Sequence, residues 1–203
     1  MQEVSKKHEL DYIRIGDALG GVQDWLPSWE MNRGGCAAVT TCDLCIYLAR
    51  QKNFPALYPF DPENLTKEDF IRFTDAMKPY LGPGPRGIDS LELYITGLEG
   101  YWSSVGYKGL RVEGVSATVP YETVEALVRT QIDAGLPIPF MLGRHWDPAF
   151  EDFEWHWFNL AGYEETPASL FVKAVTYGKG HWLNLRRLWD TGAEPRGGVI
   201  RLF

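Results

Sequence analysis

Cysteine is scarce in this chain of 203 residues, and its three cysteines all lie between positions 36 and 45. Three thiols so close together cannot form the disulfide framework of a secreted protein. No apolar run approaches the roughly 20 residues that a transmembrane helix needs, and the first nine residues lack the apolar core of a signal peptide. We therefore expect a cytoplasmic protein with reduced cysteines.

Positive charge is also in deficit, because 20 Lys and Arg residues face 27 Asp and Glu residues, which gives a net charge of −7. An acidic chain lacks the basic face that nucleic acids and anionic membrane surfaces require, and we expect neither as a partner. The four histidines show no HxxxH or comparable close spacing, and we expect no metal and no other cofactor. Aromatic residues make up 14% of the chain, which suits a sizeable core and an aromatic-walled ligand cleft.

The hydrophobic periodicity changes along the chain, from helical spacing in the front half to strand patterns in the back half. This segregation predicts an α+β fold in a single domain, 1–203, with a helical lobe over about 1–135 and a β lobe over about 136–203. We read 20–35 and 82–87 as loops, because both are rich in Gly and Pro. The expected helices are 36–51, 66–80, 89–105 and 120–134, and the expected strands are 11–16, 138–143, 155–163, 170–177, 180–185 and 198–203.

Cys36 lies where the pair Gly34-Gly35 gives way to the apolar helical run from Ala37 to Leu48. The unpaired N–H groups and the dipole of a helix N-terminus place partial positive charge beside the sulfur. Such a position can lower the pKa of a thiol well below about 8.5. Cys36 is therefore a candidate nucleophile. Cys42 and Cys45 lie in the middle of the same helix, where packing in the core is the favoured interpretation.

A candidate partner for this thiol lies 120 residues downstream, at His156, in a stretch that reads as a buried strand. A cysteine at a helix start and a histidine on a later strand are the two halves of a cysteine–histidine nucleophile pair. The alternative interpretation is that both are core residues, since free cysteines are often buried and a histidine between two tryptophans can be satisfied by packing.

The order of these two residues resembles that of papain-like cysteine peptidases, in which a cysteine opens the central helix of a helical lobe and a histidine lies on a strand of a β lobe. The segment 34–43, Gly-Gly-Cys-Ala-Ala-Val-Thr-Thr-Cys-Asp, resembles the helix start of the bacterial bacteriocin-processing, double-glycine-type branch. The segment 156–163, His-Trp-Phe-Asn-Leu-Ala-Gly-Tyr, resembles that branch's histidine strand.

This resemblance implies that Cys36 is the nucleophile, His156 the general base and Gln23 the side-chain donor to the oxyanion. Gln23 lies 13 residues before the cysteine, further than is usual in the family, and Asn32 is the reserve candidate. The family's third member is an Asn or Asp on the strand after the histidine, whereas here Thr176 or Tyr177 would occupy that place. Further candidates for the lining of the cleft are Gly35, Trp155, Trp157 and His145.

Three hypotheses of function follow. The first is a thiol hydrolase that acts on a peptide or small amide substrate. The second is a catalytically impaired protein of the same fold that binds a peptide or small ligand in the same cleft, motivated by the missing Asn or Asp. The third is a structural or interaction protein whose exposed aromatic residues form an interface. The sequence leaves the substrate and the oligomeric state open.

Overall fold

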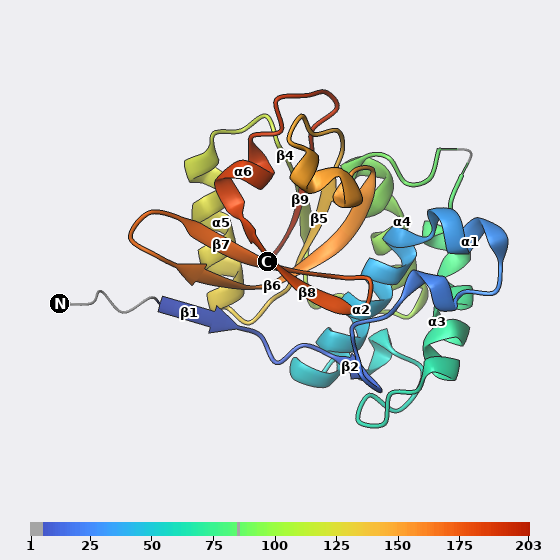
Figure 1. Ribbon diagram of the computed structural model, residues 1–203. Coiled ribbons are helices and arrows are strands. Elements are labelled where there is room, and N and C mark those ends of the chain that lie inside the picture. The colour runs from blue at the N-terminus through green and yellow to red at the C-terminus, as the bar shows by residue number, and fades with distance from the viewer. Residues whose placement is uncertain (1–5, 85) are drawn as a thin grey trace.

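The computed structural model describes residues 6–84 and 86–203, which form an antiparallel sheet with helices packed against it (Figure 1). The α+β class is therefore confirmed. The order of strands along the sheet is β4-β9-β5-β6-β7-β8, and β1 pairs with the far end of β6. The strand bounds are β1 Lys6–Glu9, β4 Val112–Ser116, β5 Ile138–Leu142, β6 His156–Glu165, β7 Leu170–Thr176, β8 Lys179–Asn184 and β9 Gly197–Leu202; β2 Arg14–Ile15 and β3 Ala18–Leu19 form a small separate hairpin.

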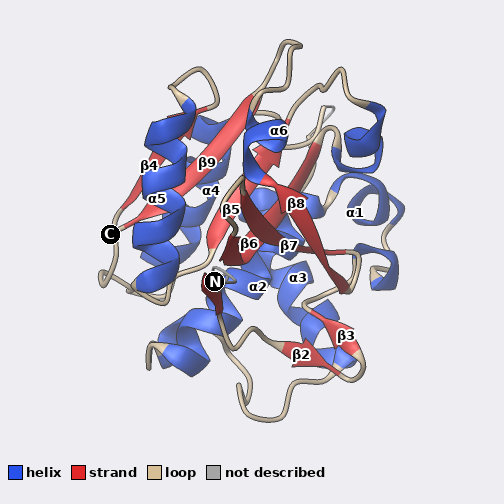
Figure 2. Ribbon diagram, turned by 60° about the vertical axis from the view of Figure 1, so that its left-hand side comes forward, coloured by secondary structure: helices blue, strands red, loops and turns tan. Residues whose placement is uncertain are grey.

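The helices cover the sheet as Figure 2 shows, with α5 over the region of β4 and β9 and with α2 and α3 near the end that carries the small hairpin. Among the described residues, no helix combines the length and the apolar character that crossing a bilayer requires. The helix bounds are α1 Trp29–Gly34, α2 Cys36–Gln51, α3 Lys67–Leu81, α4 Leu91–Ser104, α5 Tyr121–Asp133 and α6 Leu185–Trp189, with 3₁₀ turns at Gln23–Trp25, Pro55–Leu57 and Pro148–Phe153.

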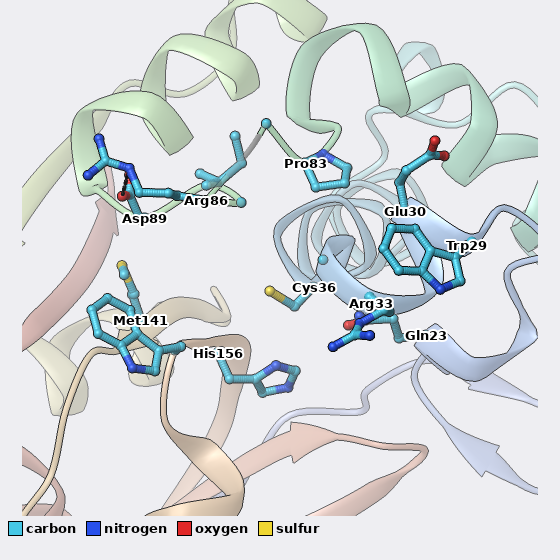
Figure 3. Close-up of a pocket in the computed structure, with 15 residues that line it drawn as sticks. Gln23, Trp29, Glu30, Arg33, Cys36, Pro83, Arg86, Asp89, Met141 and His156 are labelled. Atoms are coloured by element: carbon cyan, nitrogen blue, oxygen red, sulfur yellow. Dashed lines mark ion pairs between the residues drawn. The ribbon is translucent and has the colours of Figure 1, made fainter.

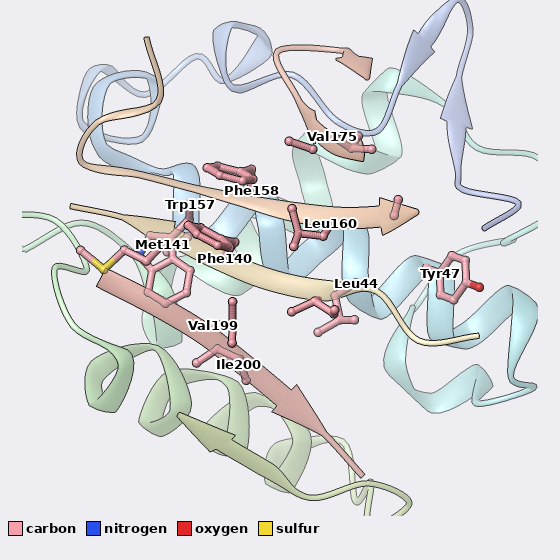
Figure 4. Packing of buried hydrophobic residues seen from close by; sticks show 14 of the residues in the cluster. Leu44, Tyr47, Phe140, Met141, Trp157, Phe158, Leu160, Val175, Val199 and Ile200 are labelled. Carbon is pink, nitrogen blue, oxygen red and sulfur yellow. The ribbon is translucent and has the colours of Figure 1, made fainter. Parts of the chain in front are cut away.

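The central strands β5 and β6 are buried on both faces, which is why their sequences read as continuous apolar runs. Neighbouring residues of a strand point to opposite faces. On one face of β6, the ring of Trp157 stacks on Tyr94 of α4 with the ring centroids 4.1 Å apart. On the other face, Phe158 stacks on Phe140 of β5 (Figure 4). Phe140 in turn contacts Trp189 of α6. The strand β6, which begins at His156, is therefore packed in one core between α4 on one face of the sheet and α6 on the other.

The sheet begins earlier in the chain than the strand pattern predicts, because β1 and β4 both come from the first 135 residues. β1 has the polar sequence Lys-Lys-His-Glu, and β4 contains Gly114 and is largely exposed. Neither strand therefore shows the alternation of apolar and polar residues that indicates a strand. The segment 20–35, predicted to be an irregular loop, contains a 3₁₀ turn and the six-residue helix α1, which is too short for a periodic signal. The predicted strand 11–16 is reduced to the two residues of β2.

Thr66 caps the N-terminus of α3, since its side chain accepts the backbone N–H of Asp69 at 3.1 Å. We expect Thr66→Ala to lower the free energy of unfolding by about 1 kcal/mol, because one helix-terminal N–H loses its partner. Ser28→Ala is the matched control, since Ser28 precedes α1 without a side-chain cap bond, and its effect should stay within about 0.5 kcal/mol. Urea denaturation measures both, and equal losses would contradict the assignment of the cap.

Candidate active site

Cys36 and His156 line the same cleft, which has a volume of about 690 Å³. Figure 3 shows the thiol and the imidazole projecting into this space, with Trp29, Glu30 and Arg33 to one side and Met141 to the other. Cys36 is the partly exposed member of the three cysteines, whereas Cys42 and Cys45 are buried in the interior of α2. The structure thus brings together the two residues that the sequence places 120 positions apart.

The position of the thiol depends on a sharp junction between two helices. Gly35 ends α1, donating its N–H to the carbonyl of Met31 at 2.9 Å, and is also the residue before α2. A Cβ atom at position 35 would lie 2.4 Å from that same carbonyl oxygen, so a side chain has no room there. Gly35 is buried and does not line the cleft; it lets Cys36 begin a new helix with its side chain in the cleft.

His156 is held from two sides by residues at the end of the neighbouring strand β7. Its Nε2 lies 2.7 Å from Oγ1 of Thr176, and its ring stacks on Tyr177 with an interplanar angle of 6° and a centroid separation of 4.8 Å. Tyr177 is fixed in turn, because its hydroxyl donates to the carbonyl of Asp152 at 2.7 Å. Within the described residues Nδ1 has no hydrogen-bond partner, so it is the ring nitrogen available to a reacting group.

Gln23 also lines the cleft beside Cys36, although 12 residues separate them in the chain. Its Nε2 donates to the backbone carbonyl of Asn32 at 2.8 Å, which fixes the amide and uses one of its two N–H groups. The intervening segment, with α1, forms the bulge that the long spacing requires. Asn32 does not line the cleft with its side chain; its carbonyl holds Gln23.

The remaining predicted cleft residues fall in different places. Trp155 lines the cleft and is 52% exposed. Trp157 is buried behind the thiol, where its indole N–H donates to the carbonyl of Ile88 at 2.7 Å. His145 does not line the cleft; its ring accepts the N–H of Asp147 in its own loop and bonds to the carbonyl of Arg187 on α6.

Sequence reasoning missed the walls of the cleft outside the histidine strand. Apart from Gly34, which belongs to the segment 34–43, these residues carry no motif. They come from α1, from the loop before α4 and from β5, so only the packing of the fold brings them together. They are Trp29, Glu30, Arg33, Gly34, Pro83, Gly84, Arg86, Gly87, Ile88, Asp89 and Met141.

The sequence predicts a lowered pKa for the Cys36 thiol, and this prediction is wrong for the structure. Burial raises the pKa of Cys36 above its usual value, although the backbone N–H groups of Trp157, Ala37 and Cys36 itself act in the lowering direction. Cys36 has some solvent contact through the cleft, yet protein atoms surround most of the sulfur. Burial also lowers the pKa of His156 to about 4. Both groups are therefore neutral near pH 7.

A buried polar network lies behind this pair, and its members were not singled out from the sequence. The Asp43 carboxyl accepts the N–H of Gly21 at 2.8 Å, and the amide of Asn159 donates to the hydroxyl of Tyr12 and to the carbonyl of Thr40. Burial raises the pKa of Asp43 to about 7, against the lowering effect of its hydrogen bonds from Gly21 and Tyr12. The network joins α2, which carries the thiol, to β6, which carries the imidazole.

Within the described residues, no group of three or more His, Cys, Asp or Glu side chains is arranged to hold a metal ion. Comparisons with family models, with curated proteins and with solved structures find no match to this chain. The geometry and electrostatics of the cleft therefore carry the functional argument by themselves.

Proposed function

We propose that this protein is a cysteine hydrolase that cleaves a peptide or small amide bond, with Cys36 as nucleophile and His156 as general base. The observation that carries this proposal is the placement of His156, whose Nε2 is bound by Thr176 while its Nδ1 is left open beside the cleft that Cys36 also lines. A base must be oriented by a third group to serve a nucleophile, and Thr176 is in that position.

In this mechanism the neutral imidazole accepts the thiol proton as the sulfur attacks the carbonyl carbon of the substrate. The carbonyl π electrons move to oxygen, and the oxyanion binds the Cys36 backbone N–H and the second amide N–H of Gln23. Collapse of the intermediate expels the amine, which takes the proton from His156, and leaves a thioester on Cys36. Water, deprotonated by His156, then hydrolyses this thioester and restores the thiol.

The same reasoning supports a papain-like arrangement as the finer description of the α+β fold. A thiol opening a buried helix and an imidazole at the start of a sheet strand meet in one cleft. The exposed side chains of Trp29 and Trp155 give that cleft apolar surface for an acyl group or a peptide side chain. Free cysteines in all three positions suit a reducing compartment, and we propose a cytoplasmic location.

A second candidate function is binding of a peptide or small ligand without turnover. The pKa of Cys36 is raised and that of His156 is lowered, so the pair holds no preformed thiolate and imidazolium. A threonine hydroxyl can also donate as well as accept, and so by itself it does not fix which ring nitrogen of His156 carries the proton. These two observations distinguish this site from a strongly activated thiol.

The test that separates these functions compares two reactions of Cys36. Iodoacetamide should label Cys36 and spare the buried Cys42 and Cys45 in the folded protein, with a rate that keeps rising beyond pH 9 because the thiol pKa is raised. p-Nitrophenyl acetate should acylate Cys36 near pH 8, and His156→Ala should slow that acylation about 10²- to 10³-fold through loss of the base.

Mass spectrometry of the labelled peptides measures both reactions. Alkylation of Cys36 without acylation, or acylation that is indifferent to His156, would overturn the hydrolase and favour the ligand-binding candidate. A labelling rate that levels off near pH 7 would instead contradict the neutral pair and show a thiolate in the resting protein.

A further inference from the structure

Asp43 lies two helical turns after Cys36 on α2, and both side chains therefore project from the same side of the helix. The carboxyl group is buried, with 4% of the residue exposed. One oxygen, Oδ1, accepts the N–H of Gly21 at 2.8 Å. Gly20 passes so close that a Cβ atom there would lie 2.4 Å from Oδ2, and its positive φ of 74° also favours glycine. The loop before Gln23 thus holds the carboxyl in one orientation.

The second oxygen of Asp43 has only a weak partner. The Tyr12 hydroxyl lies 3.5 Å from Oδ2, at the limit of a hydrogen bond. The same Cβ position on Gly20 would lie 3.2 Å from Cγ1 of Val175. Oδ2 of Asp43 is therefore close to β7, at the residue that precedes Thr176. A buried carboxyl oxygen so poorly satisfied requires a further polar partner.

A small cavity of about 10 Å³ lies between these groups. Asp43 and Thr176 both line it, together with His156, Gln23 and Cys36. A polar cavity of this size has room for about one water molecule, which needs two or more polar partners to be held. The carboxyl of Asp43 and the hydroxyl of Thr176 are two such partners.

We propose that Asp43 is a positioning residue that orients His156 through one water molecule in this cavity and through Thr176. The inference rests on the proposed hydrolase, for which it supplies the acidic member missing from the strand after the histidine. An ionised carboxylate only accepts, so the water donates one hydrogen to Oδ2. The negative charge favours the arrangement in which the Thr176 hydroxyl hydrogen also points toward the carboxylate and is accepted by the water. Thr176 then accepts the hydrogen of His156 Nε2, and Nδ1 is left unprotonated as the base.

The negative charge of the carboxylate sets the favoured direction of the hydrogen bonds in this relay. In Asp43→Asn, Oδ1 still accepts the Gly21 N–H, but an NH₂ group replaces Oδ2 and can only donate into the cavity. With the negative charge gone and the amide donating into the cavity, the favoured arrangement reverses, so that the water donates to Thr176 and Thr176 donates to Nε2. The proton of the neutral imidazole moves to Nδ1, which can no longer act as the base. Thr176→Val removes the relay without changing Asp43.

The direct test is the tautomer of His156, read from ¹⁵N chemical shifts of histidine-labelled protein at pH 8.5, with His156→Gln to assign the resonances. At this pH Asp43 is mainly a carboxylate, since its pKa is about 7. We expect hydrogen on Nε2 in the unmodified protein and on Nδ1 in Asp43→Asn. The same tautomer in both proteins would overturn the relay.

Acylation of Cys36 by p-nitrophenyl acetate gives the second readout. We expect Asp43→Asn to slow it at least about 10²-fold, by analogy with the wrong tautomer in a catalytic triad, while alkylation by iodoacetamide at pH 9.5 changes less than about threefold. If Asp43→Asn fails to fold, Thr176→Val is expected to slow acylation at least about 10-fold with the same unchanged alkylation. Acylation equal to that of the unmodified protein in the folded variant would count against the relay.

The two proposals fail in different ways. A tautomer switch in a protein whose Cys36 is never acylated would support the relay and overturn the hydrolase. Efficient acylation that depends on His156, with no change of tautomer or rate in Asp43→Asn, would retain the hydrolase and overturn the relay.

Discussion

For the proposed hydrolase, Cys36→Ala is expected to abolish esterase and amidase turnover, lowering kcat/KM by about 10⁴-fold or more, because the proposed thioester forms on this sulfur. The structure makes this expectation specific to one of three thiols on the same helix. Cys36 lines the cleft beside His156, whereas Cys42 and Cys45 are fully buried. The measurement is steady-state hydrolysis of p-nitrophenyl acetate, together with the search for an acetyl adduct on residue 36.

The matched control is Cys42→Ala, which removes a thiol from the same helix without touching the cleft. It should keep turnover within about threefold and instead lower the free energy of unfolding, since it leaves a small cavity in the core. Cys36→Ser is a second control, because its hydroxyl preserves shape but is a far weaker nucleophile. Turnover by Cys36→Ala above a tenth of that of the unmodified protein would place the nucleophile elsewhere.

The second large effect is a pair of opposite pH dependences of stability from His156 and Asp43. The pKa of His156 falls from 6.5 to about 4 on folding, so only the unfolded chain takes up this proton between those values, and stability is lost as pH falls. The pKa of Asp43 rises from 3.8 to about 7, so only the folded chain holds this proton in that window, and stability is gained as pH falls. In the unmodified protein the two slopes offset each other between pH 6.5 and pH 4.

Replacing one of the two residues should leave the pH dependence of stability that the other contributes. Relative to the unmodified protein, Asp43→Asn should lose about 3 kcal/mol of unfolding free energy between pH 6.5 and pH 4, and His156→Gln should gain about 3 kcal/mol. Urea denaturation at pH 4, 5 and 6.5 measures the difference in unfolding free energy between each variant and the unmodified protein. The titration of the surface carboxylates is common to both proteins and cancels in this difference. Curves parallel to that of the unmodified protein would show that neither group is desolvated as the structure indicates.

Much of the scaffold that presents the site follows from local patterns in the sequence. The apolar run after Gly35 predicts α2 with its observed bounds, and the run around Trp157 predicts β6 to within two residues at either end. These segments are long and periodic or continuously apolar, so their own hydrophobicity determines their structure. The pairing of Cys36 with His156 in one cleft agrees with a prediction that used only residue types and their order.

The other parts of the site depend on long-range packing. α1 and β4 lack a periodic pattern, and their structure comes from contacts with the core and with β9. The raised thiol pKa reflects burial of the sulfur in the folded protein, which a helix-start argument cannot include. Asp43 is an unremarkable residue on a helical stripe until the fold closes the loop at Gly21 over it.

Trp157 connects the chemistry to the wall that would receive a substrate. Its backbone N–H points at the Cys36 sulfur, and its indole N–H is bonded to the carbonyl of Ile88, which lines the cleft. The next residue back along β6 is His156. A ligand that contacts Ile88 in the proposed site would therefore lie one hydrogen bond and one residue away from His156, through a single indole ring.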